Sequence, residues 1–173
     1  CFSMCVGVMG TALASPLYPL YQAAWQLQTS DITLVYAVYM AGAMASLLML
    51  SSLPDRYGFV RVLRWGLVLA TFSSFLSALA WNYTSFAVAR VLVGLASGMI
   101  TTSAALGLTR LSKQGNLQMA AAMASLLIAF GFGLGPVLGG AIAQWVPNPL
   151  VSAYVPSVVL GILTIAALGP VGK

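Results

Sequence analysis

Residues 32–64 read ITLVYAVYMAGAMASLLMLSSLPDRYGFVRVLR, an uncharged apolar run that ends in a short turn carrying three arginines. A membrane-crossing helix needs about 20 mostly apolar residues, and the run from Ile32 to Leu53 supplies them. Pro54 closes such a helix, and Gly58 allows the chain to reverse its direction. The stretch therefore predicts a transmembrane helix followed by a tight turn at the membrane surface.

The rest of the chain has a similar composition. Of its 173 residues, 61% are hydrophobic and 5% are charged, and the mean hydropathy is +0.99, whereas about a quarter of the residues in a soluble domain are charged. There are seven Lys and Arg residues, two acids (Asp31 and Asp55) and no His, so most metal and acid–base sites lack their usual residues. We predict an all-α integral membrane protein that is not an enzyme and has no metal or cofactor.

The isoelectric point near 9.6 does not indicate nucleic-acid binding, because the basic residues are few and separated by apolar runs. Charges and prolines instead divide the chain into six segments of membrane-spanning length. The cluster Pro147-Asn148-Pro149 separates the last two segments. We predict one six-helix transmembrane domain over residues 1–173, with spans at about 1–22, 32–53, 62–80, 85–109, 117–145 and 150–169.

The first span begins without a leader sequence. The first residue is Cys1 rather than Met, and no charged region precedes the apolar stretch that continues to Leu20. A secretory signal has a positively charged start, so we expect the chain to begin partway into its first transmembrane helix. Cys1 and Cys5 lie four residues apart on this helix and are predicted to be small packing residues.

The basic residues fall in alternate loops, since the loops after spans two, four and six contain Lys or Arg and the other loops contain none. These residues are Arg56, Arg61, Arg64, Arg110, Lys113 and Lys173. Cytoplasmic loops of membrane proteins carry an excess of Lys and Arg. We therefore expect both ends of the chain to be cytoplasmic, in a multi-pass protein of the plasma membrane, or of the inner membrane if the protein is bacterial.

Four segments carry Gly, Pro and charged residues at regular spacing. The turn after span two contains Asp55, Arg56, Gly58 and Arg61. Span one contains Gly10, Pro16 and Pro19, and span four contains Arg90, Gly94 and Gly98. Span five contains Gly131, Gly135, Pro136, Gly139 and Gly140.

In this order and spacing, the four segments resemble motifs of the major facilitator superfamily. The segment in span five matches G-x-x-x-G-P-x-x-G-G in full, a pattern associated mainly with the antiporters of that family. The turn departs from the inner-loop gating motif G-x-x-x-D-R-x-G-R-R/K, because Ser51 replaces the first glycine and Phe59-Val60 replace the basic pair. The resemblance implies the amino-terminal half of a twelve-helix transporter of the drug:proton antiporter branch, with the carboxy-terminal six-helix domain absent from this chain.

Arg90 is the deepest charge in the sequence. It lies about five residues, or roughly 8 Å, inside the outer end of span four, and a charge at that depth tends to face a polar interior or a partner. Small and polar residues recur at helical spacing on spans one and four, and we expect them to line a central cavity, as these helices do in the family. The candidate lining residues are Thr11, Tyr18, Gln22, Ser97 and Thr101. Helix packing through small residues is the alternative interpretation.

Span five and span two each carry one further expectation. The glycines at 131, 135 and 139 form a ridge on which another helix can pack closely, and Pro136 can bend the span. At the start of span two, Asp31 is predicted to cap the helix, with Ser30 as another candidate cap. Pairing of Asp31 with Arg90 is the alternative.

The resemblance implies alternating access between two six-helix halves, with substrate bound near the midplane between them. We predict proton-coupled efflux of a small organic solute, such as a drug or metabolite, once the chain pairs with its missing half. A facilitator or symporter for a sugar, organic acid or amino acid is one alternative, and a non-transporting membrane assembly subunit is an alternative of another class. Neither acid lies deep in a span, so a coupling carboxylate is expected in the missing half unless transport is not driven by protons.

Overall fold

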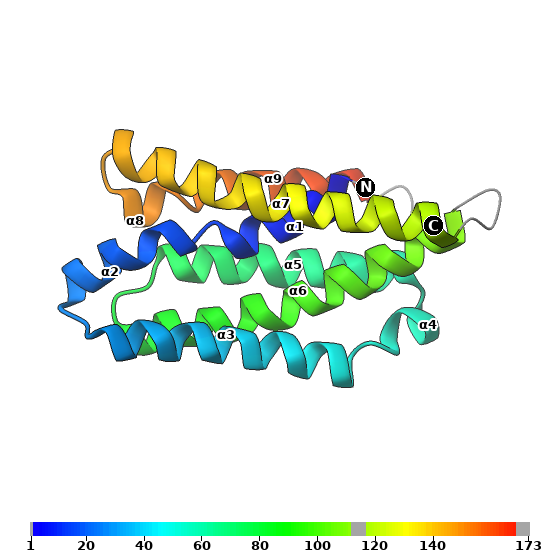
Figure 1. Ribbon diagram of the computed structural model, residues 1–173, viewed down its shortest axis with the longest axis horizontal. Helices are drawn as coiled ribbons and strands as arrows, with labels where there is room; N and C mark the ends of the chain where they lie inside the picture. Colours follow the sequence, from blue (N-terminus) through cyan, green and yellow to red (C-terminus); the bar gives the residue numbers. More distant parts are fainter. Residues whose placement is uncertain (1, 112–116, 169–173) are drawn as a thin grey trace.

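The computed structural model describes residues 2–111 and 117–168, so Cys1, Lys113 and Lys173 lie outside the described residues. Throughout the described part all regular structure is helical (Figure 1), which confirms the predicted all-α fold class. The elements are α1 (Phe2–Ala12), the 3-10 helix η1 (Ser15–Leu17), α2 (Tyr18–Trp25), α3 (Thr29–Met49), α4 (Leu53–Tyr57), α5 (Phe59–Ala78), α6 (Tyr83–Leu111), α7 (Leu117–Trp145), α8 (Pro149–Ser152) and α9 (Val155–Leu168).

Five segments of the described chain are long and apolar enough to cross a membrane. They lie in α3, α5, α6, α7 and the combined α8–α9 stretch. The remaining predicted span, residues 1–22, is not one helix. It runs through α1, η1 and α2, which follow one another along the bundle (Figure 1). The described residues therefore form six rods, of which the first is interrupted at η1 and the last between α8 and α9.

Proline causes the interruption of the first rod. Pro16 has no N–H to donate to the carbonyl of Ala12, four residues earlier. The Ser15 hydroxyl donates to that carbonyl instead, over 2.7 Å, and the chain tightens into η1 before α2 resumes with Pro19 near its start. The backbone thus turns at Ser15–Leu17 without leaving the Ala12 carbonyl unpaired.

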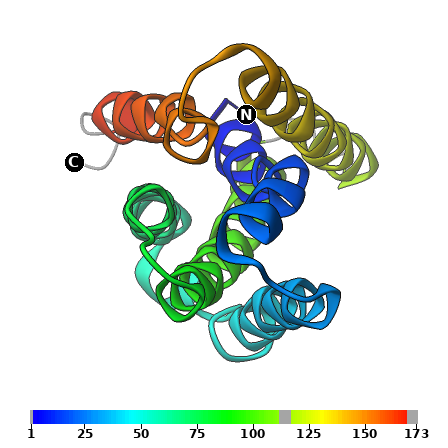
Figure 2. The ribbon, with the colours of Figure 1, turned by 90° about the vertical axis from the view of Figure 1, so that its left-hand side faces the viewer.

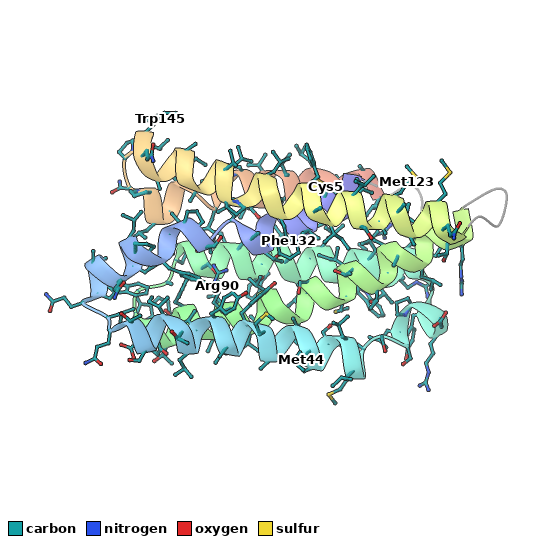
Figure 3. All side chains as sticks on the ribbon, in the orientation of Figure 1. Cys5, Met44, Arg90, Met123, Phe132 and Trp145 are labelled. Atoms are coloured by element: carbon teal, nitrogen blue, oxygen red, sulfur yellow. The ribbon has the colours of Figure 1, made fainter. Side chains whose placement is uncertain are left out.

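The bundle is centred on α1 and α6. An end-on view shows these two helices in the middle, with α3 and α7 on one side and α5 and α9 on the other (Figure 2). α3 and α5 both pack along α6, while α1 packs mainly against α7. Large apolar side chains such as Met44, Met123 and Trp145 point away from the bundle (Figure 3) and are exposed, as expected where lipid tails replace water as the solvent.

Glycines allow α3 and α6 to approach at backbone contact distance. A methyl group on Gly42 would lie 2.8 Å from the carbonyl oxygen of Val91. Methyl groups on Gly94 and Gly98 would likewise meet the α3 backbone or Ser46. The Ser46 hydroxyl donates across the same interface to the carbonyl of Leu95, over 2.8 Å, and the Tyr83 hydroxyl donates to the carbonyl of Asp31 over 3.4 Å. Small residues and hydrogen bonds thus hold this helix pair together.

Candidate functional site

The buried arginine of α6 is the most unusual side chain in the bundle. Arg90 is 1% exposed, and its Nη2 donates to the hydroxyl of Tyr154 in the α8–α9 connection over 2.8 Å. A longer contact of 3.5 Å joins Nη2 to the Ser77 hydroxyl of α5. The guanidinium carbon also lies 4.8 Å from the centre of the Phe86 ring, a distance at which a cation and an aromatic face attract. Neutral groups from three helical segments therefore hold Arg90 in place.

No carboxylate of the described residues compensates this charge. The ion pair that the structure shows there joins Asp55 to Arg110, over 3.2 Å, at the opposite end of α6. The Nε of Arg90 is buried and has no hydrogen-bond partner in the described part of the chain. Asp31 instead accepts from the backbone N–H of Gln28 over 2.9 Å in a capping box at the start of α3.

The capping role predicted for Asp31 is thus confirmed, and its pairing with Arg90 is not formed. The residue that flanks the helix start is Gln28 rather than Ser30, because α3 begins at Thr29 and includes Ser30 in its first turn. Asp31 acts from the third helical position, where its carboxylate also lies near the positive end of the helix dipole.

A cavity of about 320 Å³ lies beside Arg90, bordered by α1, α2, α3, α6 and α7. Figure 3 places Arg90 inside the bundle, closer to the α2 end than to the α4 end. The lining residues are Thr11, Ala12, Ser15, Tyr18, Tyr36, Tyr39, Met40, Arg90, Phe132 and Pro136. The lining thus combines one guanidinium, several hydroxyls and several aromatic rings, and contains no acid.

Two of the five candidate lining residues, Thr11 and Tyr18, border this cavity. The other three lie outside its lining. Gln22 reaches Thr29 with its side-chain amide over 3.5 Å. The hydroxyls of Ser97 and Thr101 donate to carbonyls of their own helix, each over 2.8 Å, so a role in the cavity stays a prediction for these three.

The α3 contribution to the cavity was not anticipated from the sequence. Tyr36, Tyr39 and Met40 recur at a spacing of three and four residues, which places them on one face of a helix. Phe132 of α7 faces them across the cavity. The sequence signal for this contribution was the recurrence of polar aromatic residues at helical spacing in an uncharged span.

The glycine ridge of α7 packs against the backbone of α1. A methyl group on Gly131 would lie 2.9 Å from the carbonyl oxygen of Cys5, and one on Gly135 would lie 2.7 Å from that of Met9. A methyl group on Gly139 would run into the carbonyl of Leu13. The helix that occupies the ridge therefore belongs to the same six-helix domain.

The other residues of the span-one and span-five motifs lie around the contact between α1 and α7. Pro136 lines the cavity, and a methyl group on Gly140 would meet Pro16 only at an ordinary distance of 3.9 Å. On the other side of α1, a methyl group on Gly10 would lie 2.5 Å from the Ser157 hydroxyl of α9. These residues pack the first rod against α7 on one side and α9 on the other. Pro19 lies within α2 and is exposed.

The arginine-bearing turn forms a separate cluster, which we call the basic end (Arg56, Arg61, Arg64 and Arg110). Asp55 of α4 pairs with Arg110 at the end of α6. Gly58 joins α4 to α5 with a φ of +87°, a left-handed conformation that favours glycine. Arg56 and Arg61 are exposed, and Arg64 donates to the carbonyl of Leu168 in α9. No group of three or more His, Cys, Asp or Glu side chains that could hold a metal occurs among the described residues.

The model of the family described as the Major Facilitator Superfamily matches residues 1–171. The chain belongs to the Major Facilitator Superfamily. It is 27% identical over 143 residues to the quinolone resistance protein NorA of Staphylococcus aureus, an alignment that covers 83% of this chain and 37% of that protein. It is 29% identical over 149 residues to the tetracenomycin C resistance and export protein of Streptomyces glaucescens, covering 83% of this chain and 28% of that protein.

These matches confirm the resemblance found in the sequence motifs. The chain is a multi-pass membrane protein of a transporter family, with the six-helix bundle of half a major-facilitator fold. It spans well under half the length of the curated relatives that it matches.

Proposed function

We propose that residues 1–173 form the amino-terminal half of an exporter that moves a small organic solute across the membrane in exchange for protons, by alternating access. The observation that supports this most directly is the cavity of about 320 Å³ around Arg90. Ligand sites for organic molecules are mostly apolar concave spaces with a few fixed polar groups, and this lining has that composition.

A carboxy-terminal six-helix half is the partner that this function requires. Both relatives extend far beyond the aligned region, which supports such a second half. The cavity is bordered by α3 and α7, which flank the same side of the bundle (Figure 2). In this proposal the second half faces that side and completes the site between the two domains.

Close helix packing favours movement of this half as a unit. α1 and α7 meet through Gly131, Gly135 and Gly139, and α3 and α6 meet through Gly42, Gly94 and Gly98. Interfaces at backbone contact distance resist sliding, because any shift produces steric overlap. A domain with two such interfaces suits rocking against a second domain better than rearrangement within itself.

Export is supported by the two relatives, whereas proton coupling rests on the antiporter-type motif of span five. The names of the two relatives refer to resistance and to export, which favours efflux over uptake. The cavity lining contains no carboxylate, so the proton-binding group of the exchange is assigned to the second half. The gating role of Asp55, Arg56, Gly58 and Arg61 remains part of this proposal.

The orientation follows from the charges. Since Lys and Arg favour cytoplasmic loops, the basic end is assigned to the cytoplasm, and both ends of the chain lie there, in the plasma membrane or the bacterial inner membrane. The lipid bilayer, the solute and protons are then the partners of this half. No enzymatic activity is part of the proposal.

Transport in everted membrane vesicles tests the function. The full reading frame that contains this chain is expressed, and uptake of an anionic dye (fluorescein), a neutral dye (Nile red) and a cationic dye (Hoechst 33342) is measured while respiration acidifies the vesicle interior. We expect dye uptake that exceeds the empty-vector control and collapses when nigericin removes the pH gradient. Uptake that survives nigericin would favour the facilitator, and uptake equal to the control would contradict export.

A further inference from the structure

We propose that the cavity around Arg90 selects an aromatic solute that carries an anionic group, and that Arg90 binds this group directly. The inference rests on the proposed function, since it names the class of solute that the same cavity takes. It follows from three features of the lining, namely its charge, its hydroxyls and its exposed rings.

The charge of Arg90 is buried without a counter-charge in the described residues. Its side chain is 1% exposed, and its Nε has no hydrogen-bond partner there. The Tyr154 hydroxyl and the Phe86 ring attract the guanidinium but carry no negative charge. A buried cation held only by neutral groups is strongly unfavourable compared with one that meets an anion. A ligand oxyanion that enters the cavity therefore gains this attraction.

The other polar groups of the lining do not reverse this preference. They are neutral hydroxyls. Those of Thr11 and Ser15 already donate to the carbonyls of Val8 and Ala12, whereas those of Tyr18, Tyr36 and Tyr39 can donate to an anion. Among the described residues, the only formal charge of the lining is thus positive. In a cavity of low dielectric, this charge favours an anionic solute and repels a cationic one.

The rings of the lining account for the aromatic part of the solute. Tyr36 is 51% exposed and Phe132 is 47% exposed, and both border the cavity. Tyr39 lies next to Tyr36, with 6.0 Å between the ring centres and an interplanar angle of 42°. Exposed aromatic faces from two sides favour a planar ring between them.

A carboxylate from the second half is the competing partner for Arg90. It would neutralise the guanidinium before a solute arrives, and the cavity would then have no preference for anions. The two possibilities differ in how the intact protein ranks ligands of equal size and different charge.

The test uses three probes that share a naphthalene ring, namely 2-naphthoate (anionic), 2-naphthamide (neutral) and 2-naphthylmethylammonium (cationic). Equilibrium binding of each radiolabelled probe is measured on the purified intact transporter that contains this chain, and on its Arg90→Gln and Arg90→Lys variants. Arg110→Gln is the matched control, because it removes the same charge from the other end of α6, outside the cavity.

We expect the unmodified protein to bind 2-naphthoate more tightly than 2-naphthamide by about tenfold or more, the size of a charge-assisted hydrogen bond, and to bind the cation most weakly. Arg90→Gln removes this preference, Arg90→Lys keeps part of it, and Arg110→Gln leaves it unchanged. Equal binding of the three probes, a preference for the cation, no binding of any probe, or a preference that persists in Arg90→Gln would each overturn the inference.

Two features of the design keep the outcomes separate. If Arg90→Gln does not fold, the ranking of the probes on the unmodified protein and on Arg90→Lys still decides. If the vesicles export dye but the purified protein shows no preference for 2-naphthoate, this inference alone is overturned. If the vesicles export no dye, the proposed function itself is contradicted.

Discussion

The contact between α7 and α1 can be tested with two glycines that lie two residues apart on the same helix. A methyl group on Gly135 would lie 2.7 Å from the carbonyl oxygen of Met9, 3.0 Å from the Cβ of Ala12 and 3.1 Å from the backbone nitrogen of Leu13. A methyl group on Gly133 would meet nothing within 4 Å. The variants Gly135→Ala and Gly133→Ala therefore add the same atom in opposite surroundings.

The expected difference follows from two effects. Replacing glycine by alanine within a helix favours the folded state by up to about 1 kcal/mol, and this gain is common to both variants. Overpacking costs about 1–3 kcal/mol, and only Gly135→Ala incurs it, because the neighbouring atoms belong to backbone that cannot rotate away. Gly135→Ala should therefore be less stable than Gly133→Ala by about 1–3 kcal/mol.

Thermal denaturation of the detergent-solubilised intact protein, followed by size-exclusion chromatography, measures this difference. With about 2–4 °C per kcal/mol for a domain of this size, Gly135→Ala should lose its monodisperse peak at least a few degrees below Gly133→Ala. Gly135→Val should lower the temperature further. Equal temperatures for the two alanine variants would refute the close approach of α7 to α1.

Three further predictions concern the ends of the bundle. Asp55→Asn removes the ion pair with Arg110, but both side chains are more than half exposed (63% and 51%). The loss of stability, measured by the same thermal denaturation, should therefore stay below about 1 kcal/mol. A larger loss would show that the pair does more than join α4 to α6. Tyr57→Cys should react with a membrane-impermeant maleimide only from the cytoplasmic side of the membrane. Asn148→Cys should react only from the external side. Labelling of both cysteines from one side would contradict the assigned orientation. Asp31→Asn should weaken the capping box by about 0.5–1 kcal/mol and leave the pH dependence of transport unchanged, whereas a shifted pH profile would assign Asp31 to proton coupling.

The spans were predictable from the sequence because a bilayer demands long apolar helices. Charges and prolines placed five of the six rods close to where the structure has them. The interruption of the first rod was harder to predict, since hydropathy remains high through Ser15–Leu17 while the missing donor of Pro16 changes the local helix type. Hydropathy indicates whether a segment lies in lipid or in water, but it does not indicate whether the backbone hydrogen bonds of its helix are continuous.

The site was only partly predictable. Arg90 stood out because it is the one deep charge, but its partner Tyr154 lies 64 residues away in the chain, a contact that no local pattern encodes. Tyr36 and Tyr39 recur at helical spacing on α3, but apolar residues surround them on this helix, so the sequence did not indicate which face of α3 borders the cavity. Gly94 and Gly98 were compatible with either a cavity wall or a helix interface. The structure places both in the interface with α3.

The break in the first rod also changes what holds each part of the cavity wall in place. Ser15 and Tyr18 border the cavity at or beyond the break, whereas Thr11 borders it before the break. Before the break, the glycines of α7 pack against α1. Beyond it, α2 is held by Tyr21, which is 1% exposed, lies 4.2 Å from the Phe86 ring centre and donates to the Tyr154 hydroxyl. Bending at the break stretches no regular i-to-i−4 bond at Pro16, because that bond is already missing. The wall therefore depends on the glycine contacts of α1 at Thr11, and on the aromatic contacts of Tyr21 at Tyr18.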